Sequence, residues 1–392
     1  MKSLLGRVRK GTILLVDGGA EHRYGEGAPI VRVTIHDRRA YGAAIWHSSI
    51  GLGSSYFNGW WDCDDLTGLL QILLRAVTPS TQRKDRWARR LAPVLAPLTR
   101  IARTDWKRDR DNIRAHYDIS NDFFQLMLDE TMAYSCAYFE DPSVSLADAS
   151  REKFDRLCRK LNIGPDDHVL EIGTGWGGFA LHAAKVYGAR VTTTTISDAQ
   201  FEHASKLVVD AGLSDLVTVL NRDYRDLEGL YDKVVSIEMI EAIGWRQLDT
   251  YFATCSKLLK PDGLMGLQAI VIEDQSYERA KKKEDFIKRY IFPGGFLPST
   301  EALLRSMSSV TDLRIRDIED IGRHYAETLR LWRGNLDDNR EALEALNLGA
   351  HFERMWRFYL SYCEAAFLER HISCGQFVLS RNAWHPAFGQ LA

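Results

Sequence analysis

Residues 169–180 read VLEIGTGWGGFA, and this stretch decides the fold. A short apolar run leads into four closely spaced glycines, Gly173, Gly175, Gly177 and Gly178, and an apolar, helix-like run follows them. Glycines at such a point let the backbone bend sharply and approach a ligand closely. The stretch therefore predicts a strand, a tight turn and a helix, with a ligand bound at the turn.

The same alternation of strand, turn and helix continues along the chain. Buried strands are predicted at HVLEIG, RVTTTTIS, LVTVLN, DKVVSIEM and GLMGLQAIVI, with helical stretches between them. One of these helices is expected to end in SKLLKPDG, a lysine-rich turn closed by Gly263. Alternating strands and helices predict an α/β fold with a doubly wound, mostly parallel, Rossmann-like sheet.

The domain organisation follows from shifts in composition. Residues 1–78 hold short alternating segments and an apolar helix-like run, which predict a smaller N-terminal α+β domain. Residues 79–110 are rich in proline and arginine and read as a basic linker. The catalytic domain is expected over 111–392.

The basic residues are concentrated in one segment of the chain. Eleven Lys/Arg and four Asp lie between Arg83 and Arg114, whereas the whole chain has a formal net charge of -2. This stripe fits either a solvated linker or a surface that meets anionic lipid headgroups. Nucleic acid is a weaker third reading, because no base-reading module accompanies the stripe.

The cysteines and the apolar runs indicate a cytoplasmic protein without a metal site. The six cysteines form no CxxC pair and no zinc-type spacing, and the chain is too large to need disulfides. The first residues lack the continuous apolar core of a secretion signal, and no run of 18 apolar residues occurs. Any membrane contact is therefore expected to be peripheral.

The glycine turn leaves its ligand open. Gly173, Gly175 and Gly178 satisfy GxGxxG, so a nicotinamide cofactor is one possibility and a purely structural turn is another. A negative charge on Glu171 would oppose a pyrophosphate but would suit a sulfonium ligand. No acid ends the second strand to bind a ribose, since Asp198 already lies at the helix cap. S-Adenosylmethionine is therefore favoured.

Two further strand ends carry candidate residues. Tyr224 follows the third strand, where a ring can stack on adenine, although packing is the commoner role of a lone tyrosine. Glu238 and Glu241 follow the fourth strand in SIEMIEAIG. Strand alternation predicts that only one of the two points into the crevice.

Five blocks of sequence resemble one family. RAHYDISNDFFQLMLDETMAYSCAYFE (114–140), VLEIGTGWGG, SIEMIEAIG, YIFPGGFLPS (290–299) and HYAETLRLW (324–332) occur in the order found in the cyclopropane fatty acid synthases, including the mycolic acid cyclopropane synthases. The resemblance implies a class I S-adenosylmethionine-dependent methyltransferase fold and a transferase that acts on the cis double bond of unsaturated phospholipid acyl chains. It also implies an N-terminal lipid-binding domain.

The resemblance assigns the cofactor positions residue by residue. It places Gly173, Gly175 and Gly177 at the methionine end, with Tyr134 and Ser135 closing over it. It matches Thr195, Ile196 and Gln200 to the ribose side and Tyr224 to the aromatic residue that covers adenine. It also implies that Ile237 lies near the same cofactor.

The resemblance also implies a bound bicarbonate ion as the catalytic base. The positions that match its site are Cys136 through its backbone, Glu241, Gln268, Ile270 and Tyr325. Two residues depart from the family pattern, because Gln268 and Ala242 stand where histidine is common. Glutamine can donate a hydrogen bond to an anion but cannot exchange a proton near neutral pH.

The expected chemistry is methyl transfer to the alkene, which leaves a carbocation that must then lose a proton. Loss from the new methyl closes a cyclopropane, whereas a hydride shift followed by loss elsewhere gives a methyl- or methylene-branched chain. The resemblance implies the cyclopropane product, and the two departures keep the branching reaction open as the alternative. The resemblance further implies a homodimer at the inner face of the cell membrane.

Two aromatic segments complete the predictions. In AYSCAYFE (133–140), Cys136 is not expected to be a nucleophile, because the chemistry needs no thiol intermediate and no histidine in the segment would activate one. The late run RMWRFYLSYCEAAF (354–367) predicts a helix with an aromatic face, which either packs in a core or lines an acyl tunnel.

Overall fold

A computed structural model describes residues 5, 6, 8–76 and 121–385 of the chain. The chain divides into two compact units, each assembled from separate segments. The first unit comprises Met1–Leu126, Asp285–Ile291 and Leu336–Glu369, and the second comprises Met127–Glu284, Phe292–Asn335 and Arg370–Ala392. The basic stripe predicted at 83–114 and the linker at 79–110 lie outside the described residues, so the predicted domain boundaries stay predictions.

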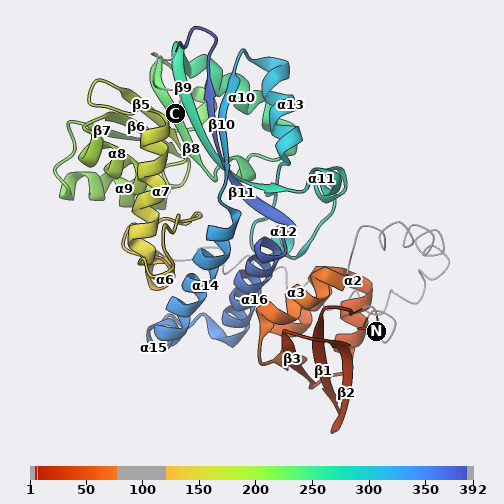
Figure 1. Ribbon diagram of the computed structural model, residues 1–392. Coiled ribbons are helices and arrows are strands. Elements are labelled where there is room, and N and C mark those ends of the chain that lie inside the picture. The colour runs from red at the N-terminus through yellow and green to blue at the C-terminus, as the bar shows by residue number, and fades with distance from the viewer. Residues whose placement is uncertain (1–4, 7, 77–120, 386–392) are drawn as a thin grey trace. The chain divides into compact units, whose positions relative to one another are not determined.

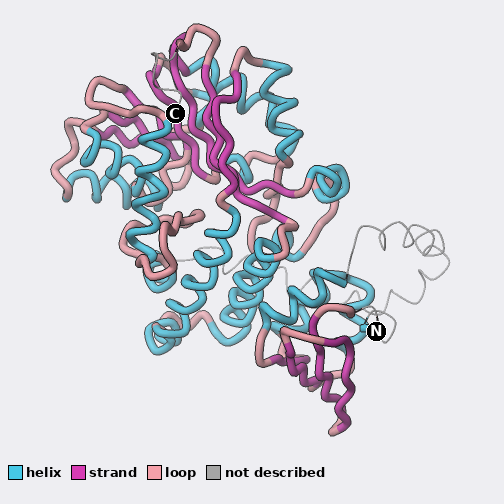
Figure 2. The backbone as a smooth tube through the Cα atoms, viewed as in Figure 1, coloured by secondary structure: helices cyan, strands magenta, loops and turns pink. Residues whose placement is uncertain are grey.

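The first unit contains a small sheet and helices packed on it (Figure 2). The strands are β1 (Gly11–Asp17), β2 (Ala20–Glu26), β3 (Ile30–Ile35) and β4 (Trp61–Cys63), in the order β2-β1-β3-β4. The helices are α2 (Arg39–Phe57), α3 (Leu66–Ala76), α12 (Phe286–Tyr290), α15 (Arg340–Ala345) and α16 (Gly349–Leu368), with α6 (Asn121–Met127) ending at the boundary. The apolar run that begins at Leu66 thus forms α3, as the sequence predicts.

The aromatic face predicted for residues 354–367 lies on α16, which packs against α2 and α3. Trp356 and Phe358 are buried, and Trp356 stacks on Phe352 with ring centroids 5.6 Å apart. Glu364 accepts a hydrogen bond from Thr67 of α3 at 2.9 Å. Packing within the first unit therefore accounts for these rings.

The second unit is built on a seven-stranded sheet (Figure 1). Its strands are β5 (His168–Ile172), β6 (Arg190–Thr195), β7 (Val217–Asn221), β8 (Tyr231–Ile237), β9 (Leu259–Ile272), β10 (Arg314–Asp320) and β11 (Ile372–Ser380). They lie in the order β10-β11-β9-β8-β5-β6-β7, and β5 to β9 are parallel whereas β10 and β11 are antiparallel. The order reverses between β5 and β8, which is where such sheets bind ligands.

Helices cover both faces of this sheet (Figure 1). They are α7 (Leu146–Lys160), α8 (Gly178–Tyr187), α9 (Asp198–Asp210), α10 (Leu248–Leu258), α11 (Asp274–Ala280) and α13 (Thr300–Val310). Helix α14 (Gly322–Asp338) begins in the second unit and ends in the first. Neighbouring residues of one strand enter different cores, because side chains alternate along a strand. Leu170 and Val234 join the core with α10 and α13, whereas Val169 and Val235 join the core with α7 and α8.

One predicted turn is wrong. Helix α10 ends at Leu258, and β9 begins at Leu259 and runs through the residues KPDG without the expected turn. Leu259 is fully buried and pairs with Tyr231, and an irregular register with β8 absorbs the extra residues before Leu264. Strand pairing and burial of Leu259 therefore override the local turn signal of Pro261 and Gly263.

Candidate active site

The glycine loop connects β5 to α8 as the sequence predicts. Gly173 and Gly177 have φ values of +101° and +96°, a region that other residues rarely adopt. The amides of Gly173 and Thr174 donate to the carbonyl of Thr194 on β6 at 3.0 Å. A Cβ on Gly173 would come within 3.0 Å of Met239, so the loop lies directly against the chain that leaves β8.

Glu171 lies inside the sheet rather than at the rim of a crevice. Its side chain is 2% exposed, and its Oε2 accepts a 2.6 Å hydrogen bond from the Thr193 hydroxyl. Burial raises the pKa of Glu171 from 4.5 to about 8. The carboxyl is therefore mostly protonated at neutral pH, so attraction of a sulfonium by its negative charge is not supported.

The positions matched to the ribose and adenine follow the carboxyl ends of β6 and β7. The Thr195 hydroxyl donates to Gln200 Oε1 at 2.8 Å, and Ile196 beside it is 76% exposed. Tyr224 begins a short 3₁₀ turn after β7, with its ring 5.8 Å from that of Tyr251. Ile237 is the last residue of β8. All of these residues lie at the same edge of the sheet as the glycine loop.

The segment 133–140 contributes Tyr134 and Ser135 to the second unit. The ring of Tyr134 lies 5.1 Å from Trp332 and 6.2 Å from Phe292. Ser135 is buried and accepts a 2.6 Å hydrogen bond from Lys153 of α7. Lys153 is also fully buried, and burial lowers the pKa of its ammonium group. Lys153 therefore holds the segment 133–140 through its hydrogen bond to Ser135.

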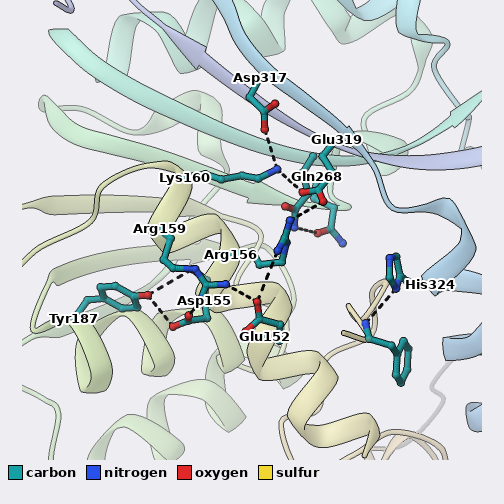
Figure 3. Close-up of polar contacts among 12 residues, drawn as sticks. Glu152, Asp155, Arg156, Arg159, Lys160, Tyr187, Gln268, Asp317, Glu319 and His324 are labelled. Atoms are coloured by element: carbon teal, nitrogen blue, oxygen red, sulfur yellow. Dashed lines mark hydrogen bonds and ion pairs between the residues drawn. The ribbon is translucent and has the colours of Figure 1, made fainter. Parts of the chain in front are cut away.

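Ring contacts at Tyr138 and ion pairs of α7 also hold the segment 133–140 in place. Tyr138 stacks on His324 with centroids 4.3 Å apart, and the guanidinium of Arg156 lies 4.0 Å from the Tyr138 ring centre. Figure 3 shows Arg156 and Lys160 of α7 paired with Glu319 of β10, each at 2.6 Å. These contacts tie α7 to the antiparallel edge of the sheet and position residues 136–139.

A cluster of polar groups converges on Glu238, the residue directly after β8. Glu238 Oε1 accepts from the Cys136 amide at 2.9 Å and from Gln268 Nε2 at 2.8 Å, and Oε2 accepts from the Tyr325 hydroxyl at 2.6 Å. The Cys374 thiol lies 3.6 Å from Oε1. We call Glu238, Cys136, Gln268, Tyr325 and Cys374 the carboxylate cluster.

Gln268 is held in one orientation at the centre of this cluster. Its Nε2 also donates to the carbonyl of Cys136 at 3.3 Å, and its Oε1 accepts from Gln376 Nε2 at 3.1 Å. The side chain is fully buried. The neighbouring amides therefore point its NH₂ group at Glu238, an orientation assigned from the hydrogen bonds.

Glu241, the glutamate that the resemblance selected, makes a different contact. Its Oε1 accepts from the Ile270 amide at 2.6 Å, and its Oε2 is buried with no hydrogen-bond partner in the described part of the chain. Burial, and then the charge of Glu238, raise the pKa of Glu241 to about 8. Of the five predicted residues, three thus meet at Glu238, whereas Glu241 and Ile270 form a separate pair. Glu238 is a candidate from the sequence alone, but the resemblance assigns the base site to Glu241.

The Cys136 thiol is buried and contacts backbone carbonyls. It donates to the carbonyl of Ala137 at 3.2 Å and also lies 3.6 Å from the carbonyl of Ile321. Burial raises the pKa of this thiol, which disfavours the thiolate. The hydrogen bond from Cys136 to Glu238 comes from its backbone amide. Across the described residues, no group of three or more His, Cys, Asp or Glu is arranged to hold a metal ion.

The sequence matches known enzymes along most of its length. A family described as mycolic acid cyclopropane synthetase matches residues 104–377. The chain is 41% identical to the tuberculostearic acid methyltransferase of Mycobacterium tuberculosis over 86% of this chain and 80% of that protein. It is 36% identical to the cyclopropane-fatty-acyl-phospholipid synthase of Escherichia coli over 86% of this chain and 85% of that one.

Solved structures agree with the predicted fold. A mycolic acid cyclopropane synthase complexed with SAH and CTAB covers 69% of this chain and 98% of its own, with 32% identity and a TM-score of 0.63. A coclaurine N-methyltransferase bound to SAH, at 22% identity and a TM-score of 0.59, shares the fold. The predicted α/β architecture of a class I S-adenosylmethionine methyltransferase is therefore confirmed.

Proposed function

Because the chain belongs to the mycolic acid cyclopropane synthetase family of S-adenosylmethionine-dependent transferases, we propose that it transfers one carbon to the double bond of an unsaturated fatty acyl chain. The observation that carries this proposal is the carboxylate cluster at the sheet edge beside the glycine loop. The π bond of an alkene attacks the methyl group without first losing a proton, but the cation formed afterwards must lose one. A carboxylate placed beside the cofactor loop meets that need.

The residues at the sheet edge fit S-adenosylmethionine. A Cβ at Gly175 would meet no atom within 4 Å, so the loop leaves open space beside its backbone. Tyr134, Ser135 and the glycines would hold the methionine end, and Thr195, Gln200 and Tyr224 would hold the ribose and adenine, with Ile196 and Ile237 beside them. When bound, the cofactor supplies an electrophilic methyl group on its sulfonium.

The aromatic wall beside this edge suits a reaction through a carbocation. Tyr134, Trp332 and Phe292 form a chain of ring contacts, and Tyr325 meets Trp332 edge-on at 6.1 Å. An aromatic face stabilises a nearby cation by roughly 0.5 to 2 kcal/mol. Of these rings, Trp332 and Tyr325 are buried, which would keep water from capturing the cation as an alcohol.

We propose a methyl- or methylene-branched chain as the main product. The 41% identity to a protein named as a methyltransferase supports this choice, as does a 39% identity over 282 residues to a probable fatty acid methyltransferase of Pseudomonas putida. The departures at Gln268 and Ala242 point the same way. The second candidate product is a cyclopropane, favoured by the 36% identity to the Escherichia coli synthase.

The residues expected to hold bicarbonate do not fit that ion. The Cys136 amide, Gln268 Nε2 and the Tyr325 hydroxyl all donate to Glu238, so these donors are already satisfied by a carboxylate of the chain. A second anion here would face the charge of Glu238 at close range. We derive no step through bicarbonate.

The proposal also covers the lipid that carries the acyl chain and the oligomeric state of the enzyme. We propose an unsaturated phospholipid at the inner membrane surface as the substrate and a homodimer as the working form. The similarity to a phospholipid-acting synthase over 86% of the chain, which reaches into the first unit, supports the first point. Among the described helices, none has the length and apolar character to cross a membrane. Sedimentation with anionic vesicles and light scattering test these two points.

The test uses S-adenosylmethionine with a deuterated methyl group and vesicles of monounsaturated phospholipid. We expect acyl chains that gain one labelled carbon, and mass spectrometry counts the deuterons kept. Proton NMR of the extracted esters separates cyclopropyl from branched products, which are isomers. Acyl chains without a labelled carbon, from protein that binds the cofactor, would contradict the proposal.

A further inference from the structure

Three hydrogen-bond donors expected to bind an external anion converge on a carboxylate of the chain itself. We propose that Glu238 is the proton acceptor of the reaction and takes the place of a diffusible anion such as bicarbonate. This inference rests on the one-carbon transfer proposed above. It adds a catalytic residue that the resemblance did not assign.

The backbone at Glu238 brings its carboxylate to the right place. Glu238 follows β8 directly and has a φ of +51°, which is uncommon for a residue other than glycine. Such conformations persist where surrounding contacts hold them, and they gather at functional sites. Here the contacts are those of the carboxylate cluster. A Cβ at Gly173 would meet the side chain of the next residue, Met239, so Glu238 is one residue along the chain from a contact with the cofactor loop.

The two oxygens of Glu238 have different roles. Oε1 accepts from the Cys136 amide and from Gln268 Nε2, and the Cys374 thiol lies near it. Among the described residues, Oε2 is contacted by the Tyr325 hydroxyl alone. Every one of these partners is a donor, which matches an ionised carboxylate. Oε2 keeps an acceptor site in reserve and is the oxygen that takes the proton.

The neighbouring carboxyl is unsuited to the same role. Glu241 Oε1 is bound to the Ile270 amide, and its buried Oε2 has no partner among the described residues. With a pKa raised to about 8 by burial and by the charge of Glu238, Glu241 is mostly protonated at neutral pH. A protonated carboxyl cannot accept the proton that the reaction releases. The site therefore holds one ionised and one neutral carboxyl group.

The proton-transfer step balances without a further reagent. A C–H bond of the carbocation intermediate breaks, and its electron pair forms either the third ring bond of a cyclopropane or the π bond of a branched alkene. The proton goes to Glu238 Oε2, which becomes a neutral carboxylic acid. Loss of that proton to solvent after product release restores the carboxylate.

The decisive variant is Glu238→Gly, because glycine accepts a φ of +51° without strain and leaves the three donors unoccupied. In buffer freed of carbon dioxide, we expect the parent to need no added anion and the variant to lose about 100-fold in turnover. Added formate or bicarbonate should restore the variant at least about tenfold. Glu238→Gln fills the same space without a base, so it should lose activity without being rescued. The matched control, Glu301→Gln on the exposed face of α13, should behave as the parent.

Anion binding gives a second readout that does not depend on lipid turnover. By ¹³C NMR, labelled formate and bicarbonate should bind Glu238→Gly and not the parent, while calorimetry shows an unchanged affinity for S-adenosylmethionine in both. If the parent makes no lipid product, the proposed function fails, and the binding result still decides whether Glu238 occupies the anion site. A parent that binds bicarbonate there or depends on it, or a Glu238→Gly variant with full turnover in anion-free buffer, would overturn the inference.

Discussion

Replacing Glu171 by glutamine should change how the stability of the protein depends on pH. Glu171 is buried in the sheet, and its pKa is raised to about 8 from 4.5. Glutamine has the same shape and can still accept the hydrogen bond from Thr193. The substitution therefore removes one titrating group and little else.

The sign of the effect follows from proton binding. Between pH 4.5 and 8, the folded parent keeps the proton on Glu171 whereas the unfolded chain has lost it. The free energy of unfolding of the parent therefore falls as pH rises through this window, by up to about 1.4 kcal/mol per pH unit. Glu171→Gln lacks this loss. From pH 5.5 to 7.5, the stability of the variant relative to the parent should rise by up to about 2.7 kcal/mol.

Urea unfolding of both proteins at several pH values measures this difference. Other titrating groups, Glu241 included, are common to both proteins and cancel. Glu301→Gln is the control, because Glu301 is a surface residue paired with Arg305 and should show no such trend. A stability difference between Glu171→Gln and the parent that stays flat within about 0.5 kcal/mol across this range would refute the buried, protonated state of Glu171.

Two further predictions concern the cofactor loop and the cysteine. Gly173→Ala should weaken binding of S-adenosylmethionine by at least about tenfold in calorimetry. Alanine would be strained at a φ of +101°, and its Cβ would lie 3.0 Å from Met239. The control Gly334→Ala, in an open position on α14, should leave the affinity unchanged. Cys136→Ser should keep turnover within about fivefold, since the backbone amide makes the contact with Glu238. Complete loss of activity in a folded Cys136→Ser protein would revive the thiol as a reacting group.

Local sequence patterns predicted the elements that frame the site. The glycine turn and the parallel strands could be read from the sequence because each depends on neighbouring residues, namely apolar runs and closely spaced glycines. The turn at KPDG could not, because its outcome depends on pairing between β8 and β9 and on the burial of Leu259. The segment at 83–114 lies outside the described residues, and its predicted lipid contact stays a prediction.

Sequence patterns could not decide which of Glu238 and Glu241 collects the hydrogen-bond donors. Side-chain alternation applies only within a strand, and β8 ends at Ile237. A left-handed residue at Glu238 and a 3₁₀ turn from Ile240 then reset the directions of both side chains. The resemblance favoured Glu241 by position in the motif, but the donors that identify a base come from Cys136, Gln268 and Tyr325, which are far apart in the sequence. Only the fold brings them together.

The separation of the two carboxyl groups also limits the charge that the reacting chain meets. If both glutamates were ionised, the second charge would be buried beside the first without a partner for Glu241 Oε2, at a cost that a pKa of about 8 reflects. The three donors to Glu238 fix the position of its carboxylate. In the proposed reaction, a carboxylate fixed in this way would attract the carbocation, and a base tied to the backbone would reach only the hydrogens on its own side. A diffusible anion would be replaced from solvent at each turnover, whereas Glu238 is positioned once, by folding.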